Sequence, residues 1–554
     1  MKNKIDLIWF GRNSKYPPSW ALGEIWPTDF TPYAVNKQIQ NRLENSTANA
    51  WLFWDSSLGG PDPKKIQTVL DLPGDLWHAG LRLGMGGLPD LIDFVAPTWM
   101  LNCDPDQMIE ATSWRLSLRA CLIRTEVLRQ MGNVCPNFQS LHGAALELGH
   151  RYIMHGVITR HIPWLVPEKT RLVPCTPPFE DELRFVYYRF GSFWSRWAMG
   201  RALLARYTSP QKAFRANRKI YRTPKPLGPK PFTHSHEPNL PPIEISKAKI
   251  SVLIPTLDRY PYLLKLLSQL RDQTIKPFEI IIIDQTEVGR RITTLAKEFA
   301  DLPIKLICQD KAGQCSSRNR GLKSSTGDFI LFLDDDDEVP STLMEDHLSS
   351  LHRYNAYSSS GVANEIGAGP LPKHFTYFRA SDVFPTNNTM IKRETLYPSG
   401  LFDLAYEHGQ RADGDLGMRV YLSGAVMILN PDIAVLHHHA PRGGLRSHNA
   451  RVITYASSRQ KIFHRHLPSI TEIYLAKRYF TPRQAQEILW LRTLGTFSVQ
   501  GNLLKKFIKF FASLISLPDT LWQVKKRYHQ AENMLKDYPQ IQKLKISGSK
   551  KGTT

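Results

Sequence analysis

The sequence predicts an α/β protein whose main sheet is mostly parallel. Three compact apolar runs, KISVLIP, FEIIIID and FILFL, lie between residues 249 and 333 and have the length of buried strands. Apolar residues at helical spacing, as in YLLKLLSQLRDQ, separate the first two runs. Strands that alternate with helices are typical of a parallel sheet covered by helices. Ligands of such sheets bind at the carboxyl ends of the strands.

The composition agrees with a globular fold and points to anionic partners. The 554 residues are 42% hydrophobic, enough for several buried cores. The net charge of +21 indicates nucleic acid, acidic lipid headgroups or phosphate-bearing substrates, and a solvated basic surface is the alternative. The six cysteines form no Cys-x-x-Cys pair. Their irregular spacing argues against a zinc site or a disulfide framework and favours reduced thiols in a cytoplasmic protein.

The chain is expected to contain four regions. Residues 1–165 form a mixed α/β domain in which LIWF and AWLFWD are short buried strands. Residues 166–246 hold an aromatic helix and a basic, proline-rich linker. Residues 247–450 carry the parallel sheet, and residues 451–554 are helical. We expect no signal peptide and no membrane-spanning helix, because no apolar run is long enough.

One segment of the helical region combines apolar and basic residues. Residues 502–528 combine leucine, isoleucine and phenylalanine with Lys505, Lys506 and Lys509. This pattern predicts an amphipathic helix lying on an anionic membrane, at its inner face. The alternative is a helix packed on the domain with its lysines facing water.

The sequence also contains an internal repeat. With a shift of 268 residues, residues 123–156 align with residues 391–424 without gaps. Nine positions are identical, and three of them are glycines, which usually mark a backbone requirement. The copies differ where chemistry is expected, so we interpret the first copy as a degenerate scaffold or a binding domain. The differing pairs are Asp413 with Ala145 and His437 with Lys169, and the acids 334–337 have only Asp55-Ser56-Ser57 as a loose counterpart.

A run of acids directly follows the FILFL strand. Asp334, Asp335, Asp336, Asp337 and Glu338 repel one another unless a cation neutralises them. Hard divalent ions such as Mg²⁺ or Mn²⁺ bind carboxylate oxygens and often bridge to substrate phosphates. The run therefore predicts a metal site at a strand end, with a solvated acidic turn as the alternative.

Two further groups lie downstream of the acid run. Asp413 and Asp415 fall near a helix start, where acids also favour the helix dipole. Asp413 is a candidate general base for an acceptor hydroxyl. In the strand that ends in three histidines, His437 and His439 face one way and His438 the other, so either of the first two is a candidate metal ligand.

Taken in order, VLIPTLDR, IIIIDQT, GQCSSRNRGLKSSTGDFILFLDDDDEVP, ADGDLGMR and LHHHAPRGG resemble glycosyltransferase family 2, which has the GT-A fold. The resemblance covers residues 247–450 and implies that residues 1–165 are a degenerate GT-A-like copy. It implies a nucleotide-sugar donor, with metal bound by Asp336, Asp334 and His437. It implies contacts of Pro255, Thr256, Asp284, Arg318, Asn319, Asp334 and Asp335 with the nucleotide.

The resemblance also implies a mechanism. Asp413 is the base, Mn²⁺ or Mg²⁺ offsets charge on the leaving nucleoside diphosphate, and attack from the opposite face inverts the anomeric carbon. Ala412 departs from the family's Glu-Asp pair, which affects acceptor positioning. Arg442 and Arg446 are implied to hold diphosphate. The acceptor is expected to be a glycan or a lipid-linked sugar in the synthesis of cell-surface polysaccharide or glycoconjugate.

Three alternatives remain open from the sequence. An inactive sugar-nucleotide-binding scaffold would explain Ala412, although Asp413 and the acid run are intact. A nucleotidyltransferase usually carries a glycine-rich phosphate loop after its first strand, where this chain reads PTLDRYPYL. A nucleic-acid binder is the weakest alternative, because the basic residues match no known module, so no nucleic acid partner is expected.

Overall fold

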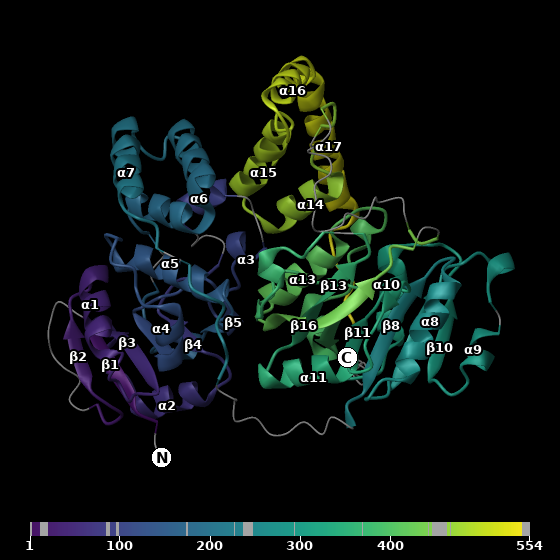
Figure 1. Ribbon diagram of the computed structural model, residues 1–554, viewed down its shortest axis with the longest axis horizontal. Coiled ribbons are helices and arrows are strands. Elements are labelled where there is room, and N and C mark those ends of the chain that lie inside the picture. The colour runs from purple at the N-terminus through teal and green to yellow at the C-terminus, as the bar shows by residue number, and fades with distance from the viewer. Residues whose placement is uncertain are drawn as a thin grey trace, which may run out of the picture.

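Two sheets lie side by side in the computed structural model of the chain, the first on the left and the second on the right of Figure 1. The structure describes residues 3–10, 20–84, 89–95, 99–172, 176–226, 228–235, 247–292, 294–367, 369–440, 443–445, 462–465 and 467–545.

The first sheet has seven strands in the order β2-β1-β3-β6-β4-β7-β5. The expected strands LIWF and AWLFWD are confirmed within β1 and β3, whose apolar residues are buried on both faces. The strands are β1 (Ile5–Phe10), β2 (Ile25–Thr28), β3 (Ala50–Asp55), β4 (Leu76–Ala79), β5 (Ala111–Thr112), β6 (Ala120–Arg124) and β7 (Thr159–His161). The helices are α1 (Pro32–Arg42), α2 (Pro63–Asp71), α3 (Trp99–Asn102), α4 (Thr125–Met131) and α5 (Leu141–Ile153).

The second sheet has nine strands in the order β10-β9-β8-β11-β15-β13-β16-β12, with β14 also paired to β16. Its strands are β8 (Ile250–Thr256), β9 (Glu279–Asp284), β10 (Ile304–Cys308), β11 (Phe329–Phe332), β12 (Asp337–Glu338), β13 (Ser358–Glu365), β14 (Arg379–Ala380), β15 (Thr389–Lys392) and β16 (Met427–His437). Its helices are α8 (Tyr260–Arg271), α9 (Leu295–Glu298), α10 (Gln314–Ser324), α11 (Leu343–Arg353), α12 (Leu396–Ser399) and α13 (Ala412–Leu422).

Both faces of the second sheet are buried, which is why its strands read as continuous apolar runs. Val252 and Ile254 of β8 pack into one core cluster, while Leu253 between them packs into another. β8 pairs in parallel with both β9 and β11. The predicted α/β fold with a mostly parallel sheet is therefore confirmed.

The two sheets share one pattern of strand pairing. In the first, β6 runs antiparallel between β3 and β4, and in the second β15 runs antiparallel between β11 and β13. Ala111 faces His161 in the first copy as Arg379 faces Leu429 in the second, so both residues of the pair are displaced by the same 268 positions. This agreement extends the sequence repeat to the edge strands.

Helices connect and follow the two sheets. α6 (Phe179–Leu204) changes direction at Gly191, where φ is 89°, and then packs against α7 (Pro210–Arg222). Ser209 caps α7, and Pro210 follows at its first turn, so a helix precedes the proline-rich stretch. The expected helical C-terminal region is confirmed by α14 (Ile470–Tyr479), α15 (Pro482–Gly495), α16 (Leu503–Ile515) and α17 (Leu517–Asp537). Within the described residues, every helix is too short or too polar to cross a bilayer.

Candidate active site

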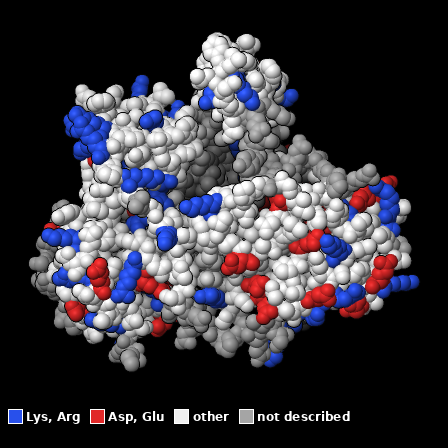
Figure 2. All heavy atoms as spheres, in the orientation of Figure 1, with Lys and Arg blue, Asp and Glu red and all other residues white. Residues whose placement is uncertain are grey.

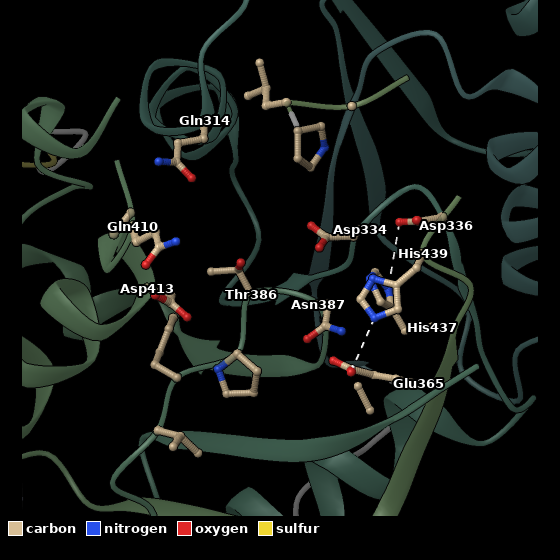
Figure 3. A pocket seen from close by; sticks show the side chains of 18 of the residues that line it. Gln314, Asp334, Asp336, Glu365, Thr386, Asn387, Gln410, Asp413, His437 and His439 are labelled. Carbon is tan, nitrogen blue, oxygen red and sulfur yellow. Dashed lines mark ion pairs between the residues drawn. The ribbon is translucent and has the colours of Figure 1, made fainter. Parts of the chain in front are cut away.

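A cavity of about 1160 Å³ lies at the carboxyl ends of β8, β11 and β13. The parallel strands deliver their last residues to one edge of the sheet, and the starts of α10 and α13 add to the wall. Figure 3 shows acids and histidines on one side of the cavity, with Gln410 and Asp413 opposite. The predicted site residues in the wall are Pro255, Thr256, Arg318, Asp334, Asp335, Asp336, Asp413 and His437.

Within the acid run, each of the first three carboxylates has its own anchor. Asp334 Oδ1 accepts a hydrogen bond of 2.9 Å from Arg318. Asp335 Oδ2 accepts one of 2.8 Å from the Thr256 hydroxyl, and its other oxygen lies 3.1 Å from Arg259 Nη1. Burial raises the pKa of Asp335 to about 7, although Arg259 opposes the shift. Asp334 and Asp335 are therefore held in fixed positions before any ligand binds.

Asp336 and Asp337 turn in different directions. Asp336 is buried in the cavity wall, where Oδ2 accepts a hydrogen bond of 2.8 Å from the Ala440 amide. Asp336 Oδ1 lies 3.0 Å from Arg259 and has no hydrogen-bond partner. Asp337 does not line the cavity, and its Oδ2 accepts from the backbone amide of Asp334. Of the four aspartates, the cavity receives Asp334, Asp335 and Asp336.

The His437 ring is oriented by Asp337. β12 pairs with β16 so that the two residues are opposite each other, and Nδ1 lies 2.8 Å from Asp337 Oδ1. Burial disfavours the charged ring, but the hydrogen bond and charge of Asp337 outweigh burial and raise the pKa of His437 to about 9. The bond fixes Nδ1 and leaves Nε2 as the nitrogen for a ligand. His439 instead pairs with Glu365 at 3.3 Å.

These donors fit a hard divalent cation if their side chains move closer to a common point. Among the described residues, no three histidine, cysteine or acidic side chains already stand at ligand distance from a common point. Asp336 Oδ1 is nevertheless buried without a hydrogen bond, 3.0 Å from the cationic Arg259 Nη1 and 3.8 Å from His437 Nδ1 (Figure 3). Carboxylate oxygens with an imidazole whose other nitrogen is held by a carboxylate match the preferences of such ions.

The two acids at the start of α13 have different surroundings. Asp413 is exposed on the cavity wall, and its Oδ1 accepts only a local hydrogen bond from Gly414 among the bonds described for it. Asp415 is buried, where Arg419 donates to it at 2.7 and 2.9 Å and the Tyr479 hydroxyl at 2.8 Å. Only Asp413 is therefore placed to take a proton from a molecule in the cavity.

Two predicted nucleotide contacts lie outside the cavity wall. The side-chain amide of Asn319 donates to the Phe402 carbonyl and accepts from the Phe402 amide, both at 2.8 Å. Asp284 accepts hydrogen bonds from the Tyr260 hydroxyl and the Thr286 amide, and its neighbour Gln285 lines the cavity instead. Both side chains are occupied by the protein itself. Arg442 and Arg446 lie outside the described residues.

Sequence reasoning missed several residues of the wall. Arg259 contacts two acids of the run, and its position just after β8 was the available signal. Glu365 ends β13, but SSSGVANE has no apolar run to reveal a strand. Gln314 and Gln410 also line the cavity (Figure 3).

In the first copy, an arginine lies at the corresponding strand end. Trp51 faces Ile123 as Ile330 faces Ile391, which places Asp55 at the position of Asp334. Arg119 Nε donates to Asp55 at 2.9 Å, and Nη2 donates to the Ser57 hydroxyl at 3.2 Å. A fixed cation thus neutralises the acid that the first copy has at this strand end.

Parts of this chain are similar in sequence to known proteins. An uncharacterized glycosyltransferase of Bacillus subtilis, YwdF, is 39% identical over 90 residues, which cover 16% of this chain and 33% of the relative. A Campylobacter jejuni enzyme named GalNAc(5)-diNAcBac-PP-undecaprenol beta-1,3-glucosyltransferase is 34% identical over 104 residues, covering 18% and 34%. The chain spans a third or less of the length of the first curated relatives it matches.

Among solved structures, a mannosyltransferase of Pyrobaculum calidifontis in complex with GDP-Man and Mn²⁺ superposes with a TM-score of 0.35 and 15% identity, over 53% of this chain and 88% of that one. The α/β fold is defined by the strand order of this chain and not by this superposition. The sequence pattern of Glycosyl transferase family 2 matches residues 251–408, the segment that carries β8, the acid run and β15. Residues 251–408, which carry most strands of the second sheet, are therefore a glycosyltransferase family 2 domain.

Proposed function

We propose that the chain transfers a hexosyl group from a nucleotide-diphosphate donor to a hydroxyl group. The reaction depends on a divalent metal ion and inverts the configuration of the anomeric carbon. One observation carries this proposal: a single cavity has Asp334, Asp336 and His437 on one side and the exposed Asp413 on the other (Figure 3). Inversion requires a base on the face opposite the leaving group, and the two sides of the cavity meet this requirement.

The donor diphosphate would lie against the acid run. Arg318 and Arg259 supply positive charge there, and Pro255 and Thr256, at the end of β8, would contact the nucleoside. Asp334, Asp336 and His437 would hold Mn²⁺ or Mg²⁺, and the ion, when bound, offsets the charge of the departing diphosphate. Asp284 and Asn319 would act behind these residues, by fixing the backbone that forms the wall.

Asp413 would accept the proton of the acceptor hydroxyl. Its place in the first turn of α13 fixes the carboxylate at the cavity wall. As the proton moves to Asp413, the hydroxyl oxygen attacks the anomeric carbon, and the bond to the donor phosphate oxygen breaks on the other face. Arg411 and Gln410, next to Asp413 on the wall, would contact the acceptor.

The acceptor in this proposal is a glycan or a lipid-linked sugar, in the synthesis of cell-surface polysaccharide or glycoconjugate. The Campylobacter relative is named for an acceptor linked to PP-undecaprenol, which supports a lipid-linked class. A cytoplasmic protein in peripheral contact with anionic membrane would meet such acceptors, and the exposed apolar residues of α16 support that contact. The first copy would serve as scaffold or partner-binding domain.

The test is donor turnover by the purified chain. The protein would be mixed with Mn²⁺ or Mg²⁺ and a panel of UDP-, GDP- and dTDP-sugars, and release of nucleoside diphosphate would be followed. Asp336→Asn is expected to abolish release, whereas Asp310→Asn, an exposed acid outside the cavity, leaves it unchanged. Donor binding by calorimetry without release, in the presence of acceptor extracts, would favour the inactive scaffold instead.

A further inference from the structure

α16 presents its apolar side to solvent. Leu503 is 83% exposed, Ile515 is 81% exposed and Phe507 is 62% exposed. The exposed set continues with Leu504, Ile508, Phe510, Phe511, Leu514, and Leu521 and Trp522 of α17. A packed helix with its apolar side inward is therefore wrong for this segment. Contiguous apolar surface of this kind marks an interaction site.

The same arm carries basic residues around the apolar ones. The exposed residues are flanked by Lys505, Lys506, Lys525 and Lys526. The one acid among residues 503–526, Asp519, pairs with Arg465. The third predicted lysine, Lys509, is buried and donates to the His464 carbonyl. We call residues 503–526 the C-terminal arm.

A second projection has the same chemistry. Residues 192–222 form the hairpin of α6 and α7, which we call the basic hairpin. It exposes Phe193, Leu204 and Phe214 at 67%, 74% and 69%. It contains no acid, and its basic residues are Arg196, Arg201, Arg206, Lys212, Arg215, Arg218, Lys219 and Arg222. Figure 2 shows basic side chains gathered over α7, whereas most acidic side chains of that view lie lower on the molecule.

The two projections point in one direction and are joined at their bases. In Figure 1 both rise from the same side of the molecule. Arg201 of α6 donates to Glu487 of α15 at 2.6 and 2.8 Å, and Arg483 contacts the Tyr207 hydroxyl. The buried Glu487 makes this a fixed junction rather than a loose surface pair.

The helices that precede the C-terminal arm, α14 and α15, are connected to the cavity wall. Glu472 of α14 binds Arg492 of α15 and lies 3.6 Å from Arg411, which lines the cavity beside Asp413. The arrow of β16 points toward the side from which the projections rise, so the carboxyl ends of the parallel strands lie on that side (Figure 1). The cavity therefore lies at the end of the sheet that faces the side from which the two projections rise.

We propose that the basic hairpin and the C-terminal arm dock together on an anionic lipid bilayer, and that this surface presents a lipid-linked acceptor to the cavity. This proposal deepens the membrane contact of the proposed function, and the acceptor class rests on that function, whereas docking can be measured without any transfer activity. Aromatic and aliphatic residues beside lysine and arginine are the composition of surfaces that insert at the headgroup level. Cations close to anionic headgroups add electrostatic attraction to this insertion.

A bilayer explains both projections better than a second copy of the chain does. A copy that covered α16 would need acids opposite Lys505, Lys506, Lys525 and Lys526, but it would meet the same acid-poor surface. A nucleic acid would explain the cations but not the exposed Leu503, Phe507 and Ile515. Only anionic lipid matches the charge and the apolar side chains together.

The experiment is vesicle flotation of the full chain, without donor or acceptor. Vesicles of phosphatidylcholine alone would be compared with vesicles that also contain phosphatidylglycerol. One variant reverses charge on the hairpin (Lys212→Glu, Arg215→Glu, Arg218→Glu), and another removes apolar side chains from the arm (Phe507→Ser, Phe511→Ser, Ile515→Ser). The matched control reverses three exposed lysines on α1, α2 and α9 (Lys37→Glu, Lys64→Glu, Lys297→Glu). Thermal melting checks that every variant is folded.

The unaltered chain is expected to float with the anionic vesicles, and each docking variant is expected to lose at least about tenfold in affinity. The control should change by less than about twofold, since its charges lie away from the docked side. Equal loss in the control, loss in only one docking variant, or a dimer that the serine variant breaks without vesicle binding would overturn the proposal. Nucleoside diphosphate release without vesicles separately reports the proposed function.

Discussion

Gly424 in the second copy lies directly against the carbonyl group of Glu110 in the first. A Cβ at Gly424 would fall well inside contact distance of that oxygen. The counterpart of Gly424 is Gly156, whose Cβ would lie 2.8 Å from the carbonyl oxygen of Phe378. Since Gly156 and Glu110 are displaced by 268 from Gly424 and Phe378, each copy offers the same turn to the same edge of the other. This is the geometry of an isologous two-fold interface within one chain.

The interface makes Gly424→Ala a strongly destabilising change. Gly424 has φ of 89°, which costs a residue with a Cβ roughly 1–2 kcal/mol, and the backbone clash adds to this cost. We expect a total loss of about 3 kcal/mol or more in the free energy of unfolding, measured by denaturant titration.

Gly59→Ala is the matched control, because Gly59 has φ of 79° and nothing near its missing Cβ. It should show only the backbone cost. Gly156→Ala should fall between the two. Equal losses in all three variants would mean that the interface adds nothing to the backbone cost.

A second prediction concerns Asp413. Because its carboxylate is exposed on the cavity wall and supports no distant part of the fold, Asp413→Asn should lower the transfer rate by roughly 100- to 10,000-fold. Its melting temperature and donor affinity should stay unchanged. Steady-state kinetics with differential scanning calorimetry measure both.

Asp415→Asn provides the contrast. It leaves buried Arg419 without its carboxylate, and loss of one partner of such a pair costs about 3–5 kcal/mol. This variant should therefore have a lower melting temperature than the unaltered chain. Full activity of Asp413→Asn would remove it from the role of base.

A third prediction concerns Asp337, which does not line the cavity. Its bond to His437 Nδ1 orients the ring, and loss of such an orienting partner weakens metal binding by roughly 10- to 100-fold. Mn²⁺ titration followed by electron paramagnetic resonance should show this loss in Asp337→Asn. Asp310→Asn, outside the cavity, should bind Mn²⁺ as the unaltered chain does. An unchanged affinity in Asp337→Asn would indicate that His437 is not a ligand.

The elements that sequence reasoning found are those with strong local signals. β8, β9 and β11 are apolar on both faces, and the acid run follows the last of them directly, so strand and site could be located together. β13 escaped because its serines and glycine are buried by neighbouring strands rather than by their own hydrophobicity. Glu365, at its end, was missed with it.

Asn319 and Asp284 were predicted to contact the nucleotide, and geometry explains why they lie outside the cavity wall. Arg318 and Asn319 are neighbours on α10, and adjacent positions of a helix do not face the same way, so only Arg318 reaches the cavity. Asp284 and Gln285 follow one another at the end of β9, where side chains alternate, and Gln285 takes the cavity side. A motif names a pair, but the element that carries it decides which member faces the ligand.

The last prediction concerns Glu182 and pH. Burial, aided by the nearby charge of Asp90, raises its pKa from 4.5 to about 8. Between these values the folded chain holds a proton that the unfolded chain releases, so stability falls as pH rises through this window. At about 1.36 kcal/mol per unit, the loss is at most about 5 kcal/mol. Glu182→Gln keeps an oxygen for the Leu91 amide and carries no charge, so its advantage in unfolding free energy should grow from pH 5 to pH 8. Exposed Glu168→Gln should show no such growth, and a constant difference for Glu182→Gln would mean that Glu182 ionises normally in the folded chain.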